Sequence, residues 1–294
     1  MPSWNEVLTE IKGHTIDEIR RKYLEQLAEY TGRNVIAYYS GWLNPRQNTP
    51  HYSVNDSDKN AFMSAIHGLD KSKGLDLILH TPGGDVAAAE SLVHYLRKVF
   101  DTNIRAIIPQ LAMSAGTMIA CSCSSILMGK QSNLGPIDPQ INGIPATGVI
   151  DEFQKACDEI SQNPAITPLW QMIIQKYHPT FLGTCQSAIT WAEKFVKECL
   201  MNGMFATDPD AETKANDIVS YLTARESTLN HSRHIHSEDL EKIGLNIECM
   251  ETDNKLQDLV LTVHHAYMHT FSMTPALKIV ENHSGEAMII LGRE

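Results

Sequence analysis

Residues 75–100, LDLILHTPGGDVAAAESLVHYLRKVF, combine a short apolar run, a glycine turn and a long amphipathic pattern. The apolar run (residues 75–80) is bounded by Gly74 and Pro82, which is typical of a strand buried on both faces of a parallel sheet. From Asp85 onward the apolar residues recur at helical spacing. The stretch therefore predicts a strand, a tight turn and a helix, which is the repeating unit of layered α/β folds.

The same unit occurs again directly afterwards. Residues 104–109 (IRAIIP) predict a second buried strand, residues 114–122 (SAGTMIACS) a short helix of small residues, and residues 125–128 a further short strand. Upstream, residues 34–40 (NVIAYYS) also predict a strand. The repetition predicts an α/β fold with parallel neighbouring strands.

Helical patterns flank this α/β segment. Apolar positions recur at helical spacing over residues 4–30, and the chain turns mostly helical from about residue 149, before two short strands around Ser284-Gly285. We expect a single domain over residues 1–294, with an N-terminal helical extension (1–33), an α/β core that carries the active site (34–145) and a mainly helical C-terminal half (146–294).

Composition excludes several classes of function. The chain has 294 residues and a formal net charge of −11, which argues against nucleic acid as the main partner and against docking on an anionic membrane. No apolar run approaches the roughly 20 residues of a membrane helix, and the polar N-terminal stretch lacks a signal-peptide core. We therefore expect a cytoplasmic protein with no membrane span.

The cysteines and histidines do not form a metal-binding pattern. The six cysteines include a C-x-C pair but no C-x-x-C pair, and we interpret them as buried thiols. The 13 histidines include no H-E-x-x-H motif, and the group His264, His265 and His269 has no matched carboxylate, so we interpret it as structural. We expect no metal and no cofactor.

The glycine turn, His80-Thr81-Pro82-Gly83-Gly84-Asp85, joins a predicted buried strand to a helix. Two glycines allow backbone N–H groups to point into open space beside the end of the strand. This is what an oxyanion hole requires, since its donors must be in place before charge develops. Alone, the pattern also fits an ordinary tight turn.

Ser114 follows the next buried strand and begins the short helix. Its hydroxyl would lie near the positive end of the helix dipole, and the small residues Ala115 and Gly116 leave room for a substrate carbonyl. The ordinary role of a serine at this place is to cap the helix. If the two strands are parallel neighbours, however, the turn and Ser114 lie side by side, and the N–H groups of Gly84 and Ala115 can share one oxyanion.

Three motifs in this order and spacing resemble the serine dehydrogenase proteinase family, which is related to the Clp protease proteolytic subunit and to signal peptide peptidase A. They are LHTPGGD (79–85), AMSAGTMIA (112–120) and LGPIDPQ (134–140). The later stretches HSRHI (231–235) and EDLEKIGL (238–245) resemble the related peptidases as well. The resemblance implies a Clp protease/crotonase-like spiral core, Ser114 as nucleophile, an oxyanion hole at Gly84 and Ala115, and homo-oligomers built as rings or from trimers.

At the positions where these relatives carry their general base, this sequence has neither the histidine of one group nor the lysine of the other. The Clp subunit's histidine lies in the segment that corresponds to residues 134–140, which has no histidine here. The lysine of the signal peptide peptidase group is expected near residues 146–149, which have no lysine, and Lys155 lies about two turns further on. His231 is our preferred base, because it is near the position of the Clp subunit's catalytic aspartate and a neutral imidazole suits proton transfer.

Two further residues have open roles. Asp138 either orients the base or makes a turn between its flanking prolines, and His80 either lines the pocket or is a core histidine. The sequence thus predicts a serine endopeptidase that acts on polypeptides. It contains no P-loop motif, so any unfolding ATPase would be a separate partner. The alternatives are a crotonase-like acyl-CoA enzyme, which uses the same paired N–H donors without a serine, and an inactive scaffold of the same fold.

Overall fold

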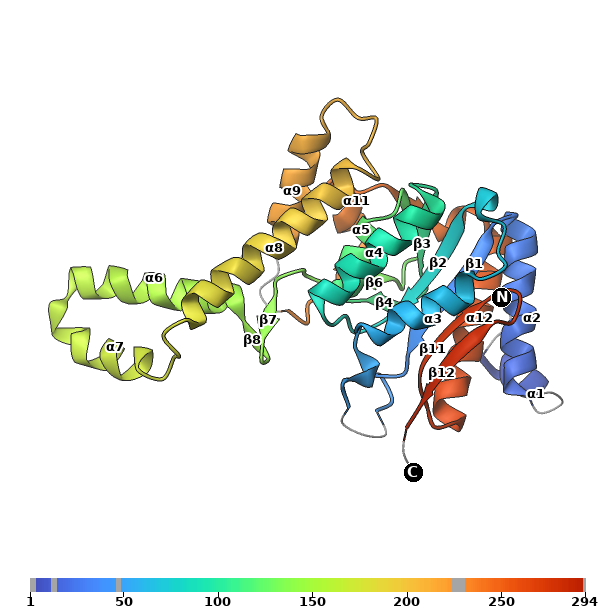
Figure 1. Ribbon diagram of the computed structural model, residues 1–294, viewed down its shortest axis with the longest axis horizontal. Helices are drawn as coiled ribbons and strands as arrows, with labels where there is room; N and C mark the ends of the chain where they lie inside the picture. Colours follow the sequence, from blue (N-terminus) through green and yellow to red (C-terminus); the bar gives the residue numbers. More distant parts are fainter. Residues whose placement is uncertain (1–3, 12–14, 46–48, 224–230, 293–294) are drawn as a thin grey trace.

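The computed structural model describes residues 4–11, 15–45, 49–223 and 231–292 and is built around a sheet of seven strands (Figure 1). The strands in spatial order are β10 (Ile247–Cys249), β5 (Ser125–Met128), β3 (Ile104–Ile108), β2 (Leu75–His80), β1 (Asn34–Ser40), β11 (Ala276–Asn282) and β12 (Ala287–Leu291). The first five are parallel, whereas β11 and β12 extend the sheet as an antiparallel pair beyond β1. The predicted α/β class and the parallel pairing of β2 with β3 are confirmed.

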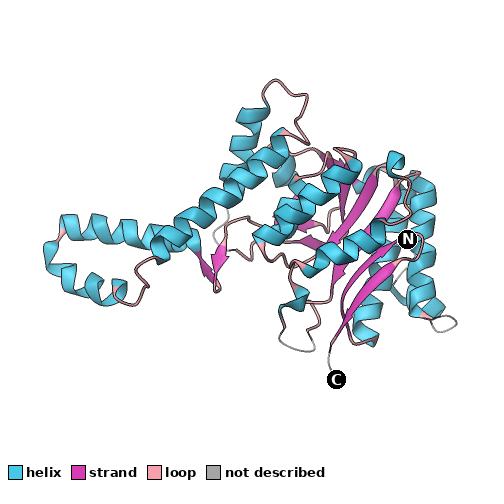
Figure 2. Cartoon of the chain, viewed as in Figure 1, coloured by secondary structure: helices cyan, strands magenta, loops and turns pink. Residues whose placement is uncertain are grey.

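Helices cover both faces of this sheet (Figures 1 and 2). Successive residues of a strand point to opposite faces. Leu77 and Leu79 of β2 accordingly belong to one hydrophobic core, and Ile78 belongs to the other. The first face carries α3 (Ser57–Ile66), α4 (Val86–Phe100) and α5 (Ala115–Cys121), and the second carries α1 (Trp4–Ile11), α2 (Ile16–Thr31) and α12 (Asn254–Met273). The two cores explain why the strands read as uninterrupted apolar runs.

The helix after the glycine turn begins where the sequence indicates. Asp85 has an extended backbone, and its carboxylate accepts the Ala88 N–H at 3.0 Å, which caps α4. A side-chain cap at this position typically stabilises a helix by about 1 kcal/mol. The turn is thus held at both ends, by β2 before it and by a capped helix after it.

A second, smaller sheet lies beside the first. It consists of β4 (Leu111–Ala112), β6 (Asn133–Leu134) and β9 (Ile235–His236), with β6 in the middle. β4 is parallel to β6, and β9 is antiparallel to it. The chain therefore leaves β4 and β6, and enters β9, at the same edge of this sheet, which is formed by the C-terminal ends of β4 and β6 and the N-terminal end of β9.

An arm of helices extends away from the two sheets (Figure 1). It is formed by α6 (Ala146–Gln162), α7 (Thr167–Ile174) and the first half of α8 (Phe181–Met201), and it starts at the hairpin β7 (Gln140–Ile141) and β8 (Ile144–Pro145). The second half of α8 packs on the core together with α9 (Ala211–Thr223). The remaining described elements are α11 (Ser237–Lys242) and the 3-10 turns η1 (Pro50–Tyr52), η2 (Lys71–Lys73), η3 (Pro164–Ile166) and η4 (Met250–Thr252).

Three strands of the main sheet come from the C-terminal half of the chain. The sequence predicts an α/β core over residues 34–145, but β10, β11 and β12 lie within 247–291. The cysteines also differ in part from expectation. Four are buried free thiols, whereas Cys157 on the arm and Cys249 on the edge strand β10 are exposed, because neither element is covered on that side. In the described part of the chain, no helix is long and apolar enough to cross a membrane.

Candidate active site

The glycine turn after β2 is packed between two other segments of the chain. Gly83 and Gly84 have φ values of +91° and +153°. A Cβ atom on Gly83 would lie 2.6 Å from the Ser114 Cβ, and one on Gly84 would lie 2.4 Å from the Val54 carbonyl oxygen. Only glycine fits these two positions, because both the backbone angles and the space exclude a side chain.

The peptide between the two glycines has a defined orientation. The Val54 N–H donates to the Gly83 carbonyl at 2.8 Å, and the Asp85 N–H donates to the Val54 carbonyl at 2.9 Å. In a trans peptide the N–H points opposite to the carbonyl. The Gly84 N–H therefore points away from Val54, and among the described residues it has no acceptor.

Ser114 directly precedes α5 at the N-cap position, but its side chain does not cap the helix. Its hydroxyl makes no capping hydrogen bond, so the ordinary role of a serine before a helix is not the one observed. Its backbone has φ 51° and ψ −116°, which is rare for a residue with a side chain and costs of order 1–3 kcal/mol. Strain of this kind is typical of a nucleophile held on a sharp strand-to-helix turn.

The N–H of Ala115 is a second available donor. Gly116 N–H donates to Met113 and Met118 N–H donates to Ser114, whereas the Ala115 N–H has no acceptor among the described residues. It is one of the first N–H groups of α5, which lack partners within a helix. A Cβ on Gly83 would be 2.9 Å from this nitrogen, so the two donor segments are in direct contact.

The small sheet brings the other polar candidates to the same edge. Ala112, Leu134 and Ile235 lie side by side in β4, β6 and β9. Ser114 follows Ala112 by two residues, and Asp138 follows Leu134 by four. His231 precedes Ile235 by four residues. Three segments that are distant in sequence therefore converge at this edge.

Asp138 and His231 form a pair. A hydrogen bond of 2.8 Å joins His231 Nδ1 to Asp138 Oδ1. The His231 side chain is 21% exposed and the Asp138 side chain is 7% exposed. Nδ1 is thereby occupied, and Nε2 is left for another partner. Among the described residues, neither side chain is hydrogen-bonded to the Ser114 hydroxyl.

Thr117 fastens the segment that carries Asp138. Its hydroxyl lies 3.0 and 2.9 Å from the carbonyl oxygens of Ala112 and Gly135 and accepts the Gly135 N–H at 3.0 Å. Thr117 lies on α5, one turn after Ser114. Sequence reasoning missed this residue, although a threonine within a run of small residues was a visible signal.

Comparison with known proteins agrees with this geometry. The model of the ClpP-like SDH-type serine proteinase family matches residues 20–268. The chain belongs to this ClpP-like serine proteinase family. It is also similar to two uncharacterized proteins of Methanocaldococcus jannaschii, at 31% identity over 197 residues and 28% over 195. These matches cover 67% and 66% of this chain but only 60% and 58% of the relatives.

The structure of this ClpP-like chain separates Lys155 from the other candidates. Lys155 lies on α6 in the arm, where its side chain is 66% exposed and its ammonium group is 3.7 Å from Glu159. An exposed pair one turn apart on a helix contributes little to stability. The structure thus places the glycine turn against Ser114 and Ala115 and joins Asp138 to His231 at the same edge of the small sheet, whereas Lys155 lies apart on the arm.

His80 is also apart, because its side chain points to the opposite face of the sheet. The ring is fully buried against Trp42, Tyr39 and His264, at centroid distances of 4.4, 5.4 and 5.2 Å. Burial, followed by the neighbouring His264, holds the pKa of His80 well below its usual value, and burial lowers the pKa of His264 to about 3. The described residues contain no group of three or more His, Cys, Asp or Glu side chains placed to hold a metal ion.

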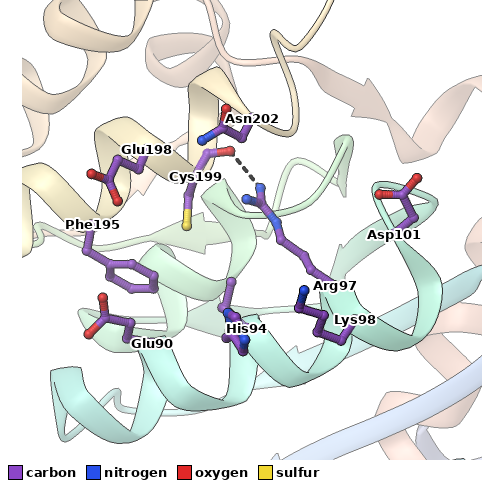
Figure 3. A pocket seen from close by; sticks show the side chains of 10 residues that line it. Glu90, His94, Arg97, Lys98, Asp101, Phe195, Glu198, Cys199 and Asn202 are labelled. Atoms are coloured by element: carbon purple, nitrogen blue, oxygen red, sulfur yellow. Dashed lines mark hydrogen bonds between the residues drawn. The ribbon is translucent and has the colours of Figure 1, made fainter.

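A hollow of about 350 Å³ lies between α4 and α8, at the opposite end of α5 from Ser114 (Figure 3). The Arg97 guanidinium donates to the carbonyl oxygens of Ser122 and Cys199, at 2.8 and 2.6 Å. These bonds tie α4 and the end of α5 to α8. We interpret Arg97 as a structural residue that anchors the base of the arm.

Replacement of Gly83 by alanine tests the packing of the turn. The added Cβ would overlap Ser114, and the φ of +91° disfavours any side chain, so the turn must move away from Ser114 and from the Ala115 N–H. A displacement of about 1 Å costs on the order of 10²-fold in rate. We expect Gly83→Ala to lower labelling by a serine-directed fluorophosphonate about 100-fold, while Gly143→Ala, an exposed glycine with a φ of +79° and open space around it, leaves the rate unchanged.

The buried histidines predict a loss of stability in acid. Their pKa values are lower in the folded chain than the value near 6.5 of the unfolded chain, so the unfolded state binds more protons below pH 6.5. The contribution of His264 is therefore complete above pH 6.5 and decreases as the pH falls toward about 3.

When the pH is lowered from 7 to 5, the free energy of unfolding should fall by about 2 kcal/mol through His264 alone, because its imidazole is protonated in the unfolded chain but not in the folded one. Urea unfolding at the two pH values would measure this, and His264→Asn should reduce the difference by that amount. The exposed His94→Asn is the matched control and should not reduce it. An equal pH dependence in wild type and His264→Asn would contradict the prediction.

Proposed function

We propose that this protein is a serine peptidase in which Ser114 forms an acyl-enzyme and the N–H groups of Gly84 and Ala115 bind the oxyanion. One observation carries the proposal: the glycine turn touches the strained Ser114, so that two backbone N–H groups without an acceptor among the described residues lie beside this serine. Membership of a serine proteinase family supports the same reaction class.

The reaction follows from this arrangement. The Ser114 oxygen attacks the scissile carbonyl carbon, and its proton passes to a general base while the carbonyl oxygen takes up negative charge between the two N–H donors. The C–N bond then breaks, and the leaving amine takes the proton. Water, deprotonated by the same base, attacks the acyl-enzyme and releases Ser114 with its proton restored.

His231 is the proposed base, and Asp138 is the proposed orienting group. The bond from Nδ1 to Asp138 fixes the ring and would stabilise its protonated form, which is the role of the acid in a serine triad. Compared with the Clp subunit, the histidine and the aspartate have exchanged places. The resemblance puts the Clp subunit's histidine in the segment that carries Asp138 here, and its aspartate near the position of His231. A hydrogen bond between the two is compatible with either order.

The rival reaction is that of a crotonase-like acyl-CoA enzyme, which would use the same donors. That reaction gives no reason for the unusual backbone of Ser114, or for a serine at the N-cap position that does not cap α5. The strained serine therefore favours a nucleophile over the acyl-CoA alternative and over an inactive scaffold.

Self-association through the arm is the second part of the proposal. The arm has a small core of its own, Ala146, Val149 and Cys185. On α7, Leu169 and Met172 are 58% and 68% exposed. Paired helices with so little buried surface need a partner for stability, and exposed large apolar side chains indicate an interface. We propose a second copy of the chain as that partner; the substrate is a polypeptide, and any unfolding ATPase is a separate chain.

Labelling by a fluorophosphonate probe, read by intact mass, tests the reaction. The phosphorus bonds to the Ser114 oxygen and fluoride leaves, so one adduct is expected on wild type and none on Ser114→Ala. His231→Ala should lower the rate about 10²–10⁴-fold, and Asp138→Asn should lower it less. The exposed neighbour His234→Ala and the arm variant Lys155→Ala are controls that should label normally. A folded wild type without an adduct would refute the peptidase.

Light scattering after size exclusion tests the arm. Leu169→Glu combined with Met172→Glu places two charges on the exposed face of α7 and should reduce the measured mass toward one chain. Met63→Glu is the control, because Met63 is 52% exposed on α3 in the body of the molecule. An unchanged mass in the arm variant would exclude α7 from the interface.

A further inference from the structure

A fully buried ion pair lies behind the glycine turn. Lys278 on β11 and Asp58 on α3 have side chains that are 1% and 2% exposed, and the Lys278 ammonium is 2.8 and 3.0 Å from the two carboxylate oxygens. Desolvating two charges costs several kcal/mol per ion, so such a pair is weak evidence for a role in stability. Its other contacts indicate what it does.

Both charges hold the segment that lies against the turn. The Lys278 ammonium donates to the Ser53 carbonyl at 2.7 Å, and the Asp58 carboxylate accepts the Asn55 N–H at 3.0 Å. Val54, between these two residues, makes both backbone hydrogen bonds to the turn. The ion pair thus fixes residues 53–55, and these fix the peptide whose N–H belongs to Gly84.

A second connection reaches the turn through Tyr38. Its hydroxyl donates to Asp58 at 2.8 Å and also interacts with the Thr81 side chain. The Thr81 hydroxyl in turn accepts the Gly83 N–H at 3.2 Å. Both connections begin at one carboxylate and end on the two glycines.

A matched pair on the same strand lacks these connections. Arg20 and Glu281 have side chains that are 0% exposed and 2.7 Å apart, and the Tyr267 hydroxyl donates to Glu281 at 2.9 Å. Each cation also lies near its tyrosine ring, at 5.4 Å for Arg20 and 5.5 Å for Lys278. Glu281 is three residues from Lys278 on β11 and so points to the opposite face, where the described partners of this pair lie on α2 and α12.

From this difference we infer that Lys278, Asp58 and Tyr38 are positioning residues that hold the oxyanion-binding turn against Ser114. The inference rests on the proposed serine chemistry. When Lys278 loses its charge, the Asp58 carboxylate is left buried without its cation, the Ser53 carbonyl loses its donor, and residues 53–55 shift together with the Gly84 N–H. The reaction then slows although the nucleophile and the base are intact.

The experiment compares Lys278→Met with Arg20→Met in the full chain. Each variant removes the cation from a buried pair that has one member on β11. Because Glu281 keeps Arg21 as a second cation at 2.9 Å, Arg20→Met should lose no more stability than Lys278→Met. The labelling rate at saturating fluorophosphonate should fall about 10-fold or more in Lys278→Met, with little change in the half-saturating concentration. Arg20→Met should stay near the wild-type rate. Tyr38→Phe and Tyr267→Phe repeat the comparison with a milder change in case the methionine variants do not fold.

Hydrogen exchange of residues 81–85 gives a readout that does not depend on activity. The Asp85 N–H, bonded to Val54, should exchange faster in Lys278→Met and Tyr38→Phe than in the two control variants. Equal labelling rates and equal exchange in the matched variants would overturn the inference and leave the pair a structural one. If wild type is not labelled, the proposed function fails, and the exchange comparison alone decides whether the ion pair holds the turn.

Discussion

The contact between Gly83 and Ser114 is the constraint on which the site depends. The two residues are 31 positions apart in the sequence, yet the space between them does not admit one additional carbon atom. A second close approach lies beside it, since a Cβ on Gly116 would be 2.6 Å from the Thr81 methyl group. The turn after β2 and the start of α5 therefore interlock through glycines on both sides. This is possible because β2 and β3 are parallel neighbours and end at the same edge of the sheet.

The strain at Ser114 is tolerated because its surroundings are fixed independently. Ala115, Met118 and Ile119 of α5 are buried in the main core, and Ala112, just before Ser114, is held in the small sheet. The unusual backbone costs of order 1–3 kcal/mol. This is small beside the free energy that these neighbours contribute by burying apolar surface. An oxyanion hole made from main-chain donors needs such rigidity, since its donors must not move when charge develops.

The sequence was sufficient for the parts of the site that are local. The apolar run, the glycine turn and the helix of residues 75–100 are one continuous unit, and the Ser114 unit follows it after one crossover helix, so their proximity follows from the rule for parallel strands. Contacts across long sequence separations were not predictable in this way. Asp138 meets His231 over 93 residues and Lys278 meets Asp58 over 220, and no periodicity encodes either pairing. The tail was predicted as two short strands, but nothing in its pattern indicated that β11 pairs with β1 and carries two buried charges.

The two halves of the site therefore differ in how they are built. The backbone at the ends of two neighbouring strands supplies both proposed donors and carries the proposed nucleophile, so almost any change in that path would displace all three. The histidine and its carboxylate are side chains on segments that meet only at the edge of the small sheet. A side chain there can be exchanged for another with little effect on the path of the main chain. This explains why the motif at residues 79–85 indicates the fold more readily than it indicates the base.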